Sequence, residues 1–191
     1  MAAAADLVRS KRFGAITARD IAGAAGSSTA AINYHFRSLD ALLMRALIDT
    51  MGELGGEISA RVGQAGTEPH ARAHIFWDAV AASVREHRAL WLANFEALLE
   101  AEERPELRDQ LRQGLDFGAR ELAETLLPDS ALDAGRSGRV LDAVMLGLVV
   151  LQLLDPEAAP TADEIDQTLR ATAEQARTHL PPSGRPRQDP H

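Results

Sequence analysis

The chain has 191 residues, 46% of them hydrophobic, and a formal net charge of −8. This length allows one domain, or a small domain joined to a larger one, with a sizeable hydrophobic core. The sequence contains no Cys, which excludes disulfides, thiolate metal sites and Cys nucleophiles and fits a reducing cytoplasm.

The N-terminal segment carries no targeting signal, because the apolar run Ala2–Ala5 is too short for a signal peptide. We therefore expect a cytoplasmic protein. Runs of alternating β-branched residues are absent, and Ala, Leu, Arg and Glu dominate the chain, so the fold is expected to be all-α. The first helix is predicted over Ala3–Arg12.

Residues 17–36, TARDIAGAAGSSTAAINYHF, predict two short helices joined by a tight turn. Thr17 and Asp20 have the spacing of a capping box at the start of the first helix. Gly26 can adopt the left-handed backbone conformation that the turn requires. The small side chain of Ala22 allows the second helix to cross close to the first.

The second of these helices begins at Ser27 or Ser28, either of which can cap it, and ends near His35. Its polar side chains can reach phosphates and base edges. Such an arrangement is typical of a helix-turn-helix, whose second helix enters the major groove of DNA. Double-stranded DNA is therefore the first partner to consider.

Charge is distributed unevenly along the chain. Residues 1–48 contain six basic and three acidic side chains, a net charge of +3, which leaves −11 for the remainder. DNA binding requires local positive charge rather than a basic protein as a whole, so the N-terminal segment fits a DNA partner. Chance asymmetry is the alternative, because the excess is modest.

Beyond residue 37 the sequence predicts six more helices, which brings the total to about nine. Ser38 caps the first of them, and Thr161 with Glu164 forms a capping box before the last. The polar, Pro-rich tail, 181–191, is expected to be disordered. The predicted helices cover residues 39–62, 69–86, 88–102, 105–126, 136–154 and 162–180.

These elements divide the chain into a three-helix head, residues 1–37, and a larger helical body, residues 38–180, in which residues 38–62 form the connecting helix. Each glycine in a helix interior costs about 1 kcal/mol relative to Ala. The connecting helix therefore reads either as a loosened helix or as a hinge between head and body. It contains three glycines, Gly52, Gly55 and Gly56.

The predicted helix 136–154 is apolar on nearly every side. Its stretch Val140–Leu154 is shorter than the roughly 20 residues that span a bilayer, so a buried helix is favoured over a membrane span. The helix carries more apolar surface than a monomer core easily covers, and we expect the last two helices to form a homodimer interface. A deeply buried central helix is the alternative.

Three motifs match one known class of helix-turn-helix proteins: T-x-x-D-I-A at 17–22, A-G at 25–26 and AAINYHFRSLDALL at 30–43. On these motifs the chain resembles the TetR-type transcriptional regulators. The resemblance implies a homodimer that binds a palindromic operator near its own or a neighbouring gene. It also implies that a small molecule, the effector, binds in the body and weakens DNA binding.

The resemblance further implies roles for single residues. In the family, the residues matching Thr17 and Arg19 approach phosphates. The amide of Asn33 fits an adenine contact, a phosphate contact or a helix cap, and Thr29 can touch a thymine methyl. The DNA face of the recognition helix corresponds to Ser27, Ser28, Thr29, Ala30, Asn33, Tyr34 and His35. The last two of these lie at the far end of the helix and are expected at the DNA backbone.

Two positions depart from the family pattern. Leu39 stands where the family usually has a Lys that touches a phosphate, so Arg37 or Arg45 is expected to replace that contact. Arg12 stands where Gly is frequent, so we expect a different exit from the first helix. The chain also begins later than members that carry a basic arm, from which weaker DNA binding would follow.

The body offers side chains suited to a mostly apolar ligand cavity. Core packing is the alternative for each of them, and it is expected to hold for at least half. Asn94, Glu96 and Gln152 lie beside apolar stripes and can orient a ligand. The candidate lining residues are Phe76, Trp77, Trp91, Phe95, Phe117 and Met145.

The sequence favours neither metal nor cofactor nor enzyme chemistry. His70 and His74 are spaced i, i+4 and could hold a metal with His87, but a solvated helix face is the favoured interpretation. No acid–base pair, nucleophile elbow, phosphate loop or zinc motif stands out. We therefore predict a ligand-responsive DNA-binding repressor. The alternatives are an all-helical enzyme and an interaction module that has lost DNA binding.

Overall fold

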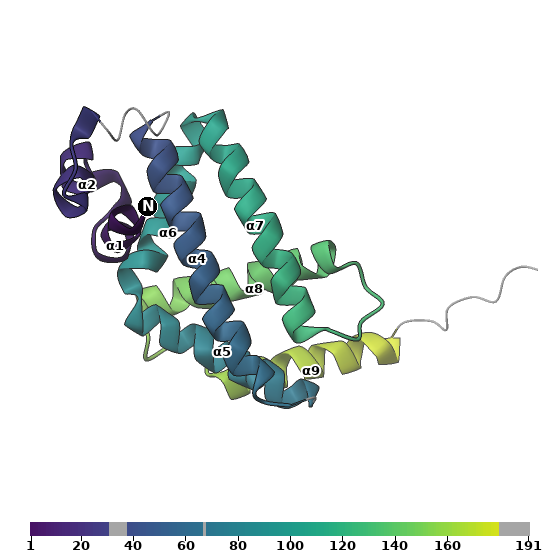
Figure 1. Ribbon diagram of the computed structural model, residues 1–191. Helices are drawn as coiled ribbons and strands as arrows, with labels where there is room; N and C mark the ends of the chain where they lie inside the picture. The colour runs from purple at the N-terminus through teal and green to yellow at the C-terminus, as the bar shows by residue number, and fades with distance from the viewer. Residues whose placement is uncertain (31–37, 67, 180–191) are drawn as a thin grey trace, which may run out of the picture.

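The structure is a computed structural model that describes residues 1–30, 38–66 and 68–179. These residues form eight α-helices and one 3-10 turn and contain no strand, which confirms the all-α prediction. Figure 1 shows a small head of short helices at one corner and a body of longer helices beside it.

The head begins with α1 (Ala2–Ser10), a 3-10 turn (Phe13–Ala15) and α2 (Ala18–Ala25). α1 ends at Ser10 rather than at the predicted Arg12. The reason is the backbone of Lys11, which is extended, with φ −126° and ψ 157°.

The helix-turn-helix geometry is present where the structure describes it. Thr17 and Asp20 form the predicted capping box. Gly26 ends α2 in the left-handed region, with φ +59°, and the Ser27 N–H donates to the Ala22 carbonyl at 2.9 Å, which closes the turn. The next helix starts with helical backbone at Thr29 and Ala30.

Some predictions fall outside the part of the chain that the structure describes. They are the positions of Asn33, Tyr34 and His35 on the recognition helix, the replacement phosphate contact by Arg37, and the disordered tail, 181–191.

The body begins with α4, which Ser38 caps as predicted by accepting the Ala41 N–H at 3.1 Å. Predicted and observed bounds agree closely, with one shift at the start of α8. Asp133 caps that helix by accepting the Arg136 N–H at 2.8 Å, so the helix starts before Arg136. The body helices are α4 (Leu39–Gly63), α5 (Pro69–Glu86), α6 (Arg88–Glu103), α7 (Pro105–Leu126), α8 (Ala134–Leu154) and α9 (Ala162–His179).

One hydrophobic core runs through head and body. Val8 of α1, Phe13 of the 3-10 turn and Ile21 of α2 belong to the same buried cluster as Leu47 of α4 and Trp91 of α6. A movement of the body helices therefore acts directly on the packing of the head.

α8 crosses α7 closely at Gly138, where an added Cβ would lie 1.8 Å from the Ala119 carbonyl oxygen. Only 22% of its most apolar window is buried, so the expectation of a buried helix is wrong for the single chain. One face packs on α5 and α7, while Val140, Leu151 and Leu154 on other sides are exposed. Among the described residues, α8 is the one helix long and apolar enough to cross a membrane by length and composition.

α9 packs against α5. Along one side of α9, Ile165 is half-buried, whereas Leu169, Ala173 and Ala176 are exposed. The last two helices thus present apolar side chains that the single chain does not cover.

Candidate DNA interface and ligand cavity

The described residues of the predicted DNA interface lie on the surface of the head. Thr17 and Arg19 of the α2 region are exposed, and so are the residues of the turn and the start of the recognition helix: Ser27, Ser28, Thr29 and Ala30. A duplex can reach this edge without any rearrangement of the core.

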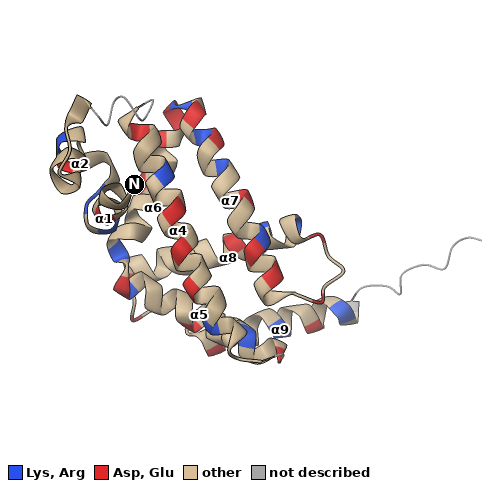
Figure 2. Cartoon of the chain, viewed as in Figure 1, with Lys and Arg blue, Asp and Glu red and all other residues tan. Residues whose placement is uncertain are grey.

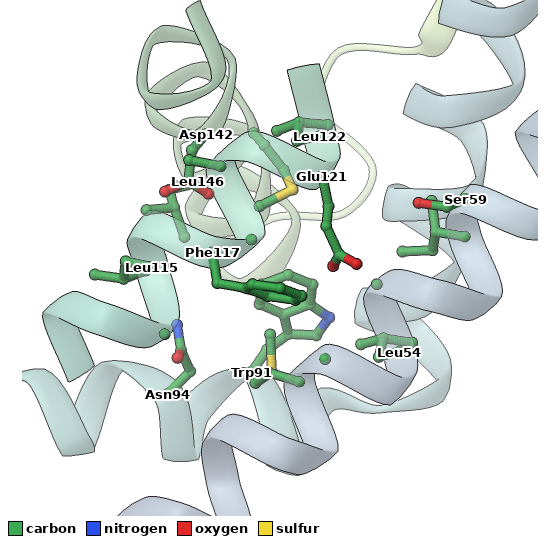
Figure 3. A pocket seen from close by; sticks show the side chains of 18 of the residues that line it. Leu54, Ser59, Trp91, Asn94, Leu115, Phe117, Glu121, Leu122, Asp142 and Leu146 are labelled. Carbon is green, nitrogen blue, oxygen red and sulfur yellow. The ribbon is translucent and has the colours of Figure 1, made fainter. Parts of the chain in front are cut away.

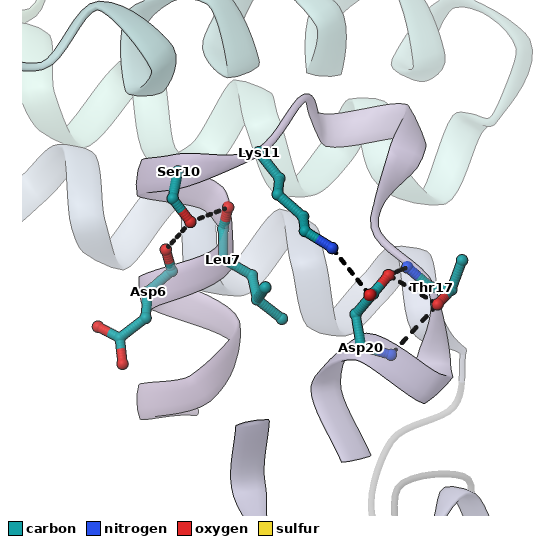
Figure 4. A network of polar contacts seen from close by, with 6 residues as sticks. All are labelled: Asp6, Leu7, Ser10, Lys11, Thr17 and Asp20. Carbon is teal, nitrogen blue, oxygen red and sulfur yellow. Dashed lines mark hydrogen bonds and ion pairs between the residues drawn. The ribbon is translucent and has the colours of Figure 1, made fainter. Parts of the chain in front are cut away.

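Thr17 and Asp20 hold each other tightly at the start of α2 (Figure 4). The Thr17 hydroxyl donates to Asp20 Oδ2 at 2.7 Å, and the Thr17 N–H donates to the same oxygen at 2.9 Å. Lys11 Nζ donates to Asp20 Oδ1 at 2.8 Å. A phosphate contact from the Thr17 hydroxyl would therefore require its bond to Asp20 to break.

These contacts also fix the charge of the cap. The hydrogen bond from Lys11, followed by those from Thr17, holds the pKa of the Asp20 carboxyl well below its ordinary value. Asp20 remains ionised and satisfies the Thr17 N–H at the positive end of the helix.

Most of the basic side chains in the N-terminal segment are paired with acids. Arg9 binds Glu53 of α4 at 2.7 Å, and Arg12 binds Glu96 of α6 at 2.7 Å. Acidic side chains are spread along α4 and α7 (Figure 2). Arg19 is exposed and, within the described residues, has no ion pair, so its charge is available to a phosphate.

The family's Lys position is filled differently here. Leu39 is half-buried and packs against the hydrophobic core, so it takes a structural role at the first residue of α4. Arg45, a predicted replacement, binds Asp49 of the same helix at 2.8 Å. A phosphate contact from Arg45 would have to compete with this carboxylate.

A cavity of about 160 Å³ lies between α4, α5, α6, α7 and α8 (Figure 3). It is open to solvent, since Phe117 and Glu121 on its wall are exposed. Four of the predicted lining residues border it: Phe76, Trp91, Phe117 and Met145. The wall is otherwise built mainly from aliphatic side chains and from glycines. The lining residues come from five helices that are far apart in the sequence, so no short stretch of the chain contains the site.

Trp77 and Phe95 do not border the cavity. Trp77 is 2% exposed and packs its ring at 74° to that of Phe76, with centroids 4.9 Å apart. Adjacent residues of an α-helix point about 100° apart, so only one of the two rings can face the cavity. On α6 the neighbouring Asn94 lines the cavity, while Phe95 is half-buried against the core.

Trp91 is held in place by a buried hydrogen-bond relay. Its indole Nε1–H donates to Ser83 Oγ at 3.2 Å, and the Ser83 hydroxyl donates to the Val80 carbonyl at 2.7 Å. Because the polar edge of the indole is satisfied from α5, the aromatic surface is left to the cavity.

Of the polar side chains on the wall, the sequence predicted only Asn94, and it did not predict that glycines line the cavity. The polar lining side chains are Ser59, Asn94, Glu121 and Asp142, and no Lys, Arg or His lines the cavity. Burial raises the pKa of the Asp142 carboxyl. The pairs Gly52 with Gly55 and Gly114 with Gly118 also line it; their spacing within helices was the signal available in the sequence.

The histidine pair of α5 has acidic partners on α9. His70 Nδ1 lies 2.8 Å from Asp166 Oδ2, and His74 Nε2 lies 3.1 Å from Asp163 Oδ1. His70 is exposed and His74 is half-buried, which agrees with the favoured interpretation as a solvated helix face, and both side chains also join α5 to α9. Within the described ranges no group of three or more His, Cys, Asp or Glu could hold a metal ion.

The other two polar candidates in the body are used elsewhere. Glu96 binds Arg12 of the head, as described above. Gln152 is 5% exposed but does not line the cavity.

Comparison with solved structures places the fold among transcriptional regulators. A putative regulator from Rhodococcus sp. RHA1 shares 17% identity over 91% of this chain and 92% of its own, with a TM-score of 0.70. A putative regulator from Saccharomonospora viridis, in complex with choline, shares 20% over 91% and 92%, with a TM-score of 0.56. The TetR family repressor AlkX from Dietzia sp. shares 18% over 93% and 92%, with a TM-score of 0.55. A search of curated proteins found no match.

Two family models together cover most of the chain. Residues 1–46 match the model of bacterial regulatory proteins of the tetR family. Residues 67–175 match the model of the tetracyclin repressor-like C-terminal domain. The chain belongs to the TetR family and is a DNA-binding transcriptional regulator, not an enzyme.

Proposed function

We propose that this protein is a cytoplasmic repressor that binds a palindromic operator as a homodimer and leaves it when a small molecule enters the body. Residues 1–37 bind DNA, residues 38–180 bind the effector and the second protomer, and residues 38–62 connect the two parts. One observation carries the proposal: two of the helices that wall the cavity, α4 and α6, also pack against the head.

The head supplies the DNA contacts. Arg19 offers an unpaired charge to a phosphate, and Thr29 offers a methyl and a hydroxyl group at the start of the recognition helix. Two heads in a dimer would enter successive major grooves about 34–36 Å apart.

α8 and α9 supply the dimer interface. Val140, Leu151 and Leu154 of α8 and Leu169 of α9 are exposed large hydrophobic side chains. Exposed apolar surface of this kind normally meets a partner. A second copy of the chain covers it in a symmetric pair, in which each protomer presents the same two helices.

Two helices transmit the effector's presence to the head. α4 lines the cavity with Met51 and Leu54 and binds the head through Glu53 and Arg9. α6 lines it with Trp91 and Asn94 and binds the head through Glu96 and Arg12. A ligand that shifts α4 or α6 changes the position of both heads, and operator affinity falls because the grooves no longer match.

The proposal is tested by selecting genomic fragments with the purified full chain and sequencing those retained. We expect a discrete site with two-fold symmetry. Ser28→Ala and Thr29→Ala are expected to retain less of it, while Ser130→Ala, a matched exposed position in the α7–α8 loop, retains it fully. Recovery of unrelated fragments, or equal retention by all three variants, would contradict the proposal.

A further inference from the structure

The charged side chains that line the cavity are all acidic. Its wall contains the carboxylates of Glu121 from α7 and Asp142 from α8, and no basic side chain. Within the described residues neither carboxylate has a hydrogen bond or ion pair. The carboxylate of Glu121 is directed at the rings of Phe117 and Trp91 (Figure 3).

Two arginines on the helices that carry these groups bind a different carboxylate. Arg139 of α8 reaches Asp116 of α7 at 2.8 Å, and Arg112 reaches the same carboxylate at 3.6 Å. Asp116 outside the cavity thus has two cationic partners, whereas Asp142, one helical turn from Arg139, has none among the residues described. Glu121 and Asp142 therefore leave a local negative charge on the cavity wall that no described basic side chain offsets.

A half-buried carboxylate without a partner is unfavourable in the free protein. Burial has already raised the pKa of Asp142. A cation placed beside it would recover the lost stabilisation, and the effect is larger in an apolar cavity than in water.

The rest of the wall suits a cation that carries an apolar body. The ring faces of Trp91 and Phe117 attract positive charge, and both residues line the cavity. Its volume of about 160 Å³ is close to that of an apolar cavity of about 150 Å³ that holds benzene. The remaining lining side chains are mainly aliphatic, so a fully hydrophilic cation would leave them without contacts.

We propose that the effector is an organic cation with an apolar body about the size of a benzene ring, whose charged group faces Asp142 and Glu121. This inference rests on the proposed function, since it names the ligand class of the effector cavity.

The test compares three probes that share one skeleton and differ in charge: 2-phenylethylammonium, 2-phenylethanol and phenylacetate. Each is titrated into the full-length protein in an isothermal titration calorimeter. We expect the ammonium to bind at least about tenfold more tightly than the alcohol, which corresponds to about 1.4 kcal/mol. Phenylacetate is expected to bind weakest, because two carboxylates repel it.

Two variants and one control test whether the preference for the ammonium arises from the carboxylates of the cavity wall. Asp142→Asn and Glu121→Gln are each expected to weaken the ammonium several-fold while changing alcohol binding less than twofold. Glu124→Gln removes the same charge from an exposed position of α7 outside the cavity and is expected to change neither. Glu121 is itself exposed, so its variant remains informative if Asp142→Asn folds poorly.

The outcomes separate this inference from the proposed function. Equal or tighter binding of the alcohol or the acid would overturn the cationic class and leave an effector cavity in place. Binding of none of the three would overturn both the cationic class and the use of the cavity as an effector site. Neither result bears on operator binding, which the selection of genomic fragments tests by itself.

Discussion

At the scale of single residues, two carboxylates of this chain lie in opposite surroundings. Asp20 accepts hydrogen bonds from Lys11 and Thr17, which lower its pKa. Asp142 borders an apolar cavity, and burial raises its pKa. The first carboxylate stabilises the head by its charge, whereas the second carries a cost that a binding partner can remove.

The raised pKa of Asp142 predicts the pH dependence of a substitution. The folded state binds the proton of this group more tightly than the unfolded state, so its favourable contribution is present below the ordinary Asp pKa and is lost as pH rises through the folded value. Asp142→Asn should therefore unfold at a higher temperature than the wild type at pH 7. The two melting temperatures should converge as pH falls towards the ordinary Asp pKa.

Thermal unfolding followed by circular dichroism at both pH values measures this difference. A variant that is less stable than the wild type at pH 7 would show that the Asp142 carboxylate has a stabilising partner. An equal difference at both pH values would show that ionisation plays no part.

At the scale of elements, the helix bounds could be predicted because their signals are local. Thr17 with Asp20, Ser38, and Thr161 with Glu164 cap helices where the sequence places them. The cavity could not be predicted in the same way. It depends on how α7 and α8 cross at Gly138, and periodicity alone does not decide which aromatic side chains of α5 and α6 face it.

α4 is a single helix through its glycines, and two of them, Gly52 and Gly55, line the cavity while Gly56 does not. A Cβ at any of the three would meet no atom within 4 Å. Gly55→Ala and Gly56→Ala should therefore each stabilise the fold by about 0.5–1 kcal/mol, the usual gain for Ala over Gly in a helix.

The two substitutions should differ in ligand binding. A methyl group at Gly55 occupies cavity space, so Gly55→Ala is expected to weaken binding of 2-phenylethanol about fivefold, while Gly56→Ala leaves it unchanged. Chemical denaturation and calorimetry measure the two effects. Equal binding by both variants would mean that this stretch of α4 does not face the bound ligand.

At the scale of the whole molecule, the account depends on the pairing of two protomers. Leu151 lies on the exposed side of α8 with 47% of its surface accessible. Leu151→Glu would place a charge in the proposed interface, and sedimentation velocity should show a dimer converted to monomers. Leu132→Glu, at a 66% exposed position in the α7–α8 loop, is the matched control and should remain dimeric. A Leu151→Glu protein that remains dimeric would place the interface elsewhere.

The central claim is that the polar edge of the head reads duplex DNA. The most direct measurement is a fluorescence anisotropy titration of the duplex recovered from genomic DNA, with wild type, Thr29→Ala and Arg19→Ala at several salt concentrations. We expect Thr29→Ala to weaken binding about tenfold. This change equals about 1.4 kcal/mol, which lies within the free energy of about 1–3 kcal/mol that one base contact contributes. Arg19→Ala should make the plot of log affinity against log salt concentration less steep by about one, because one phosphate contact is lost. Unchanged affinity and salt dependence in both variants would contradict the account.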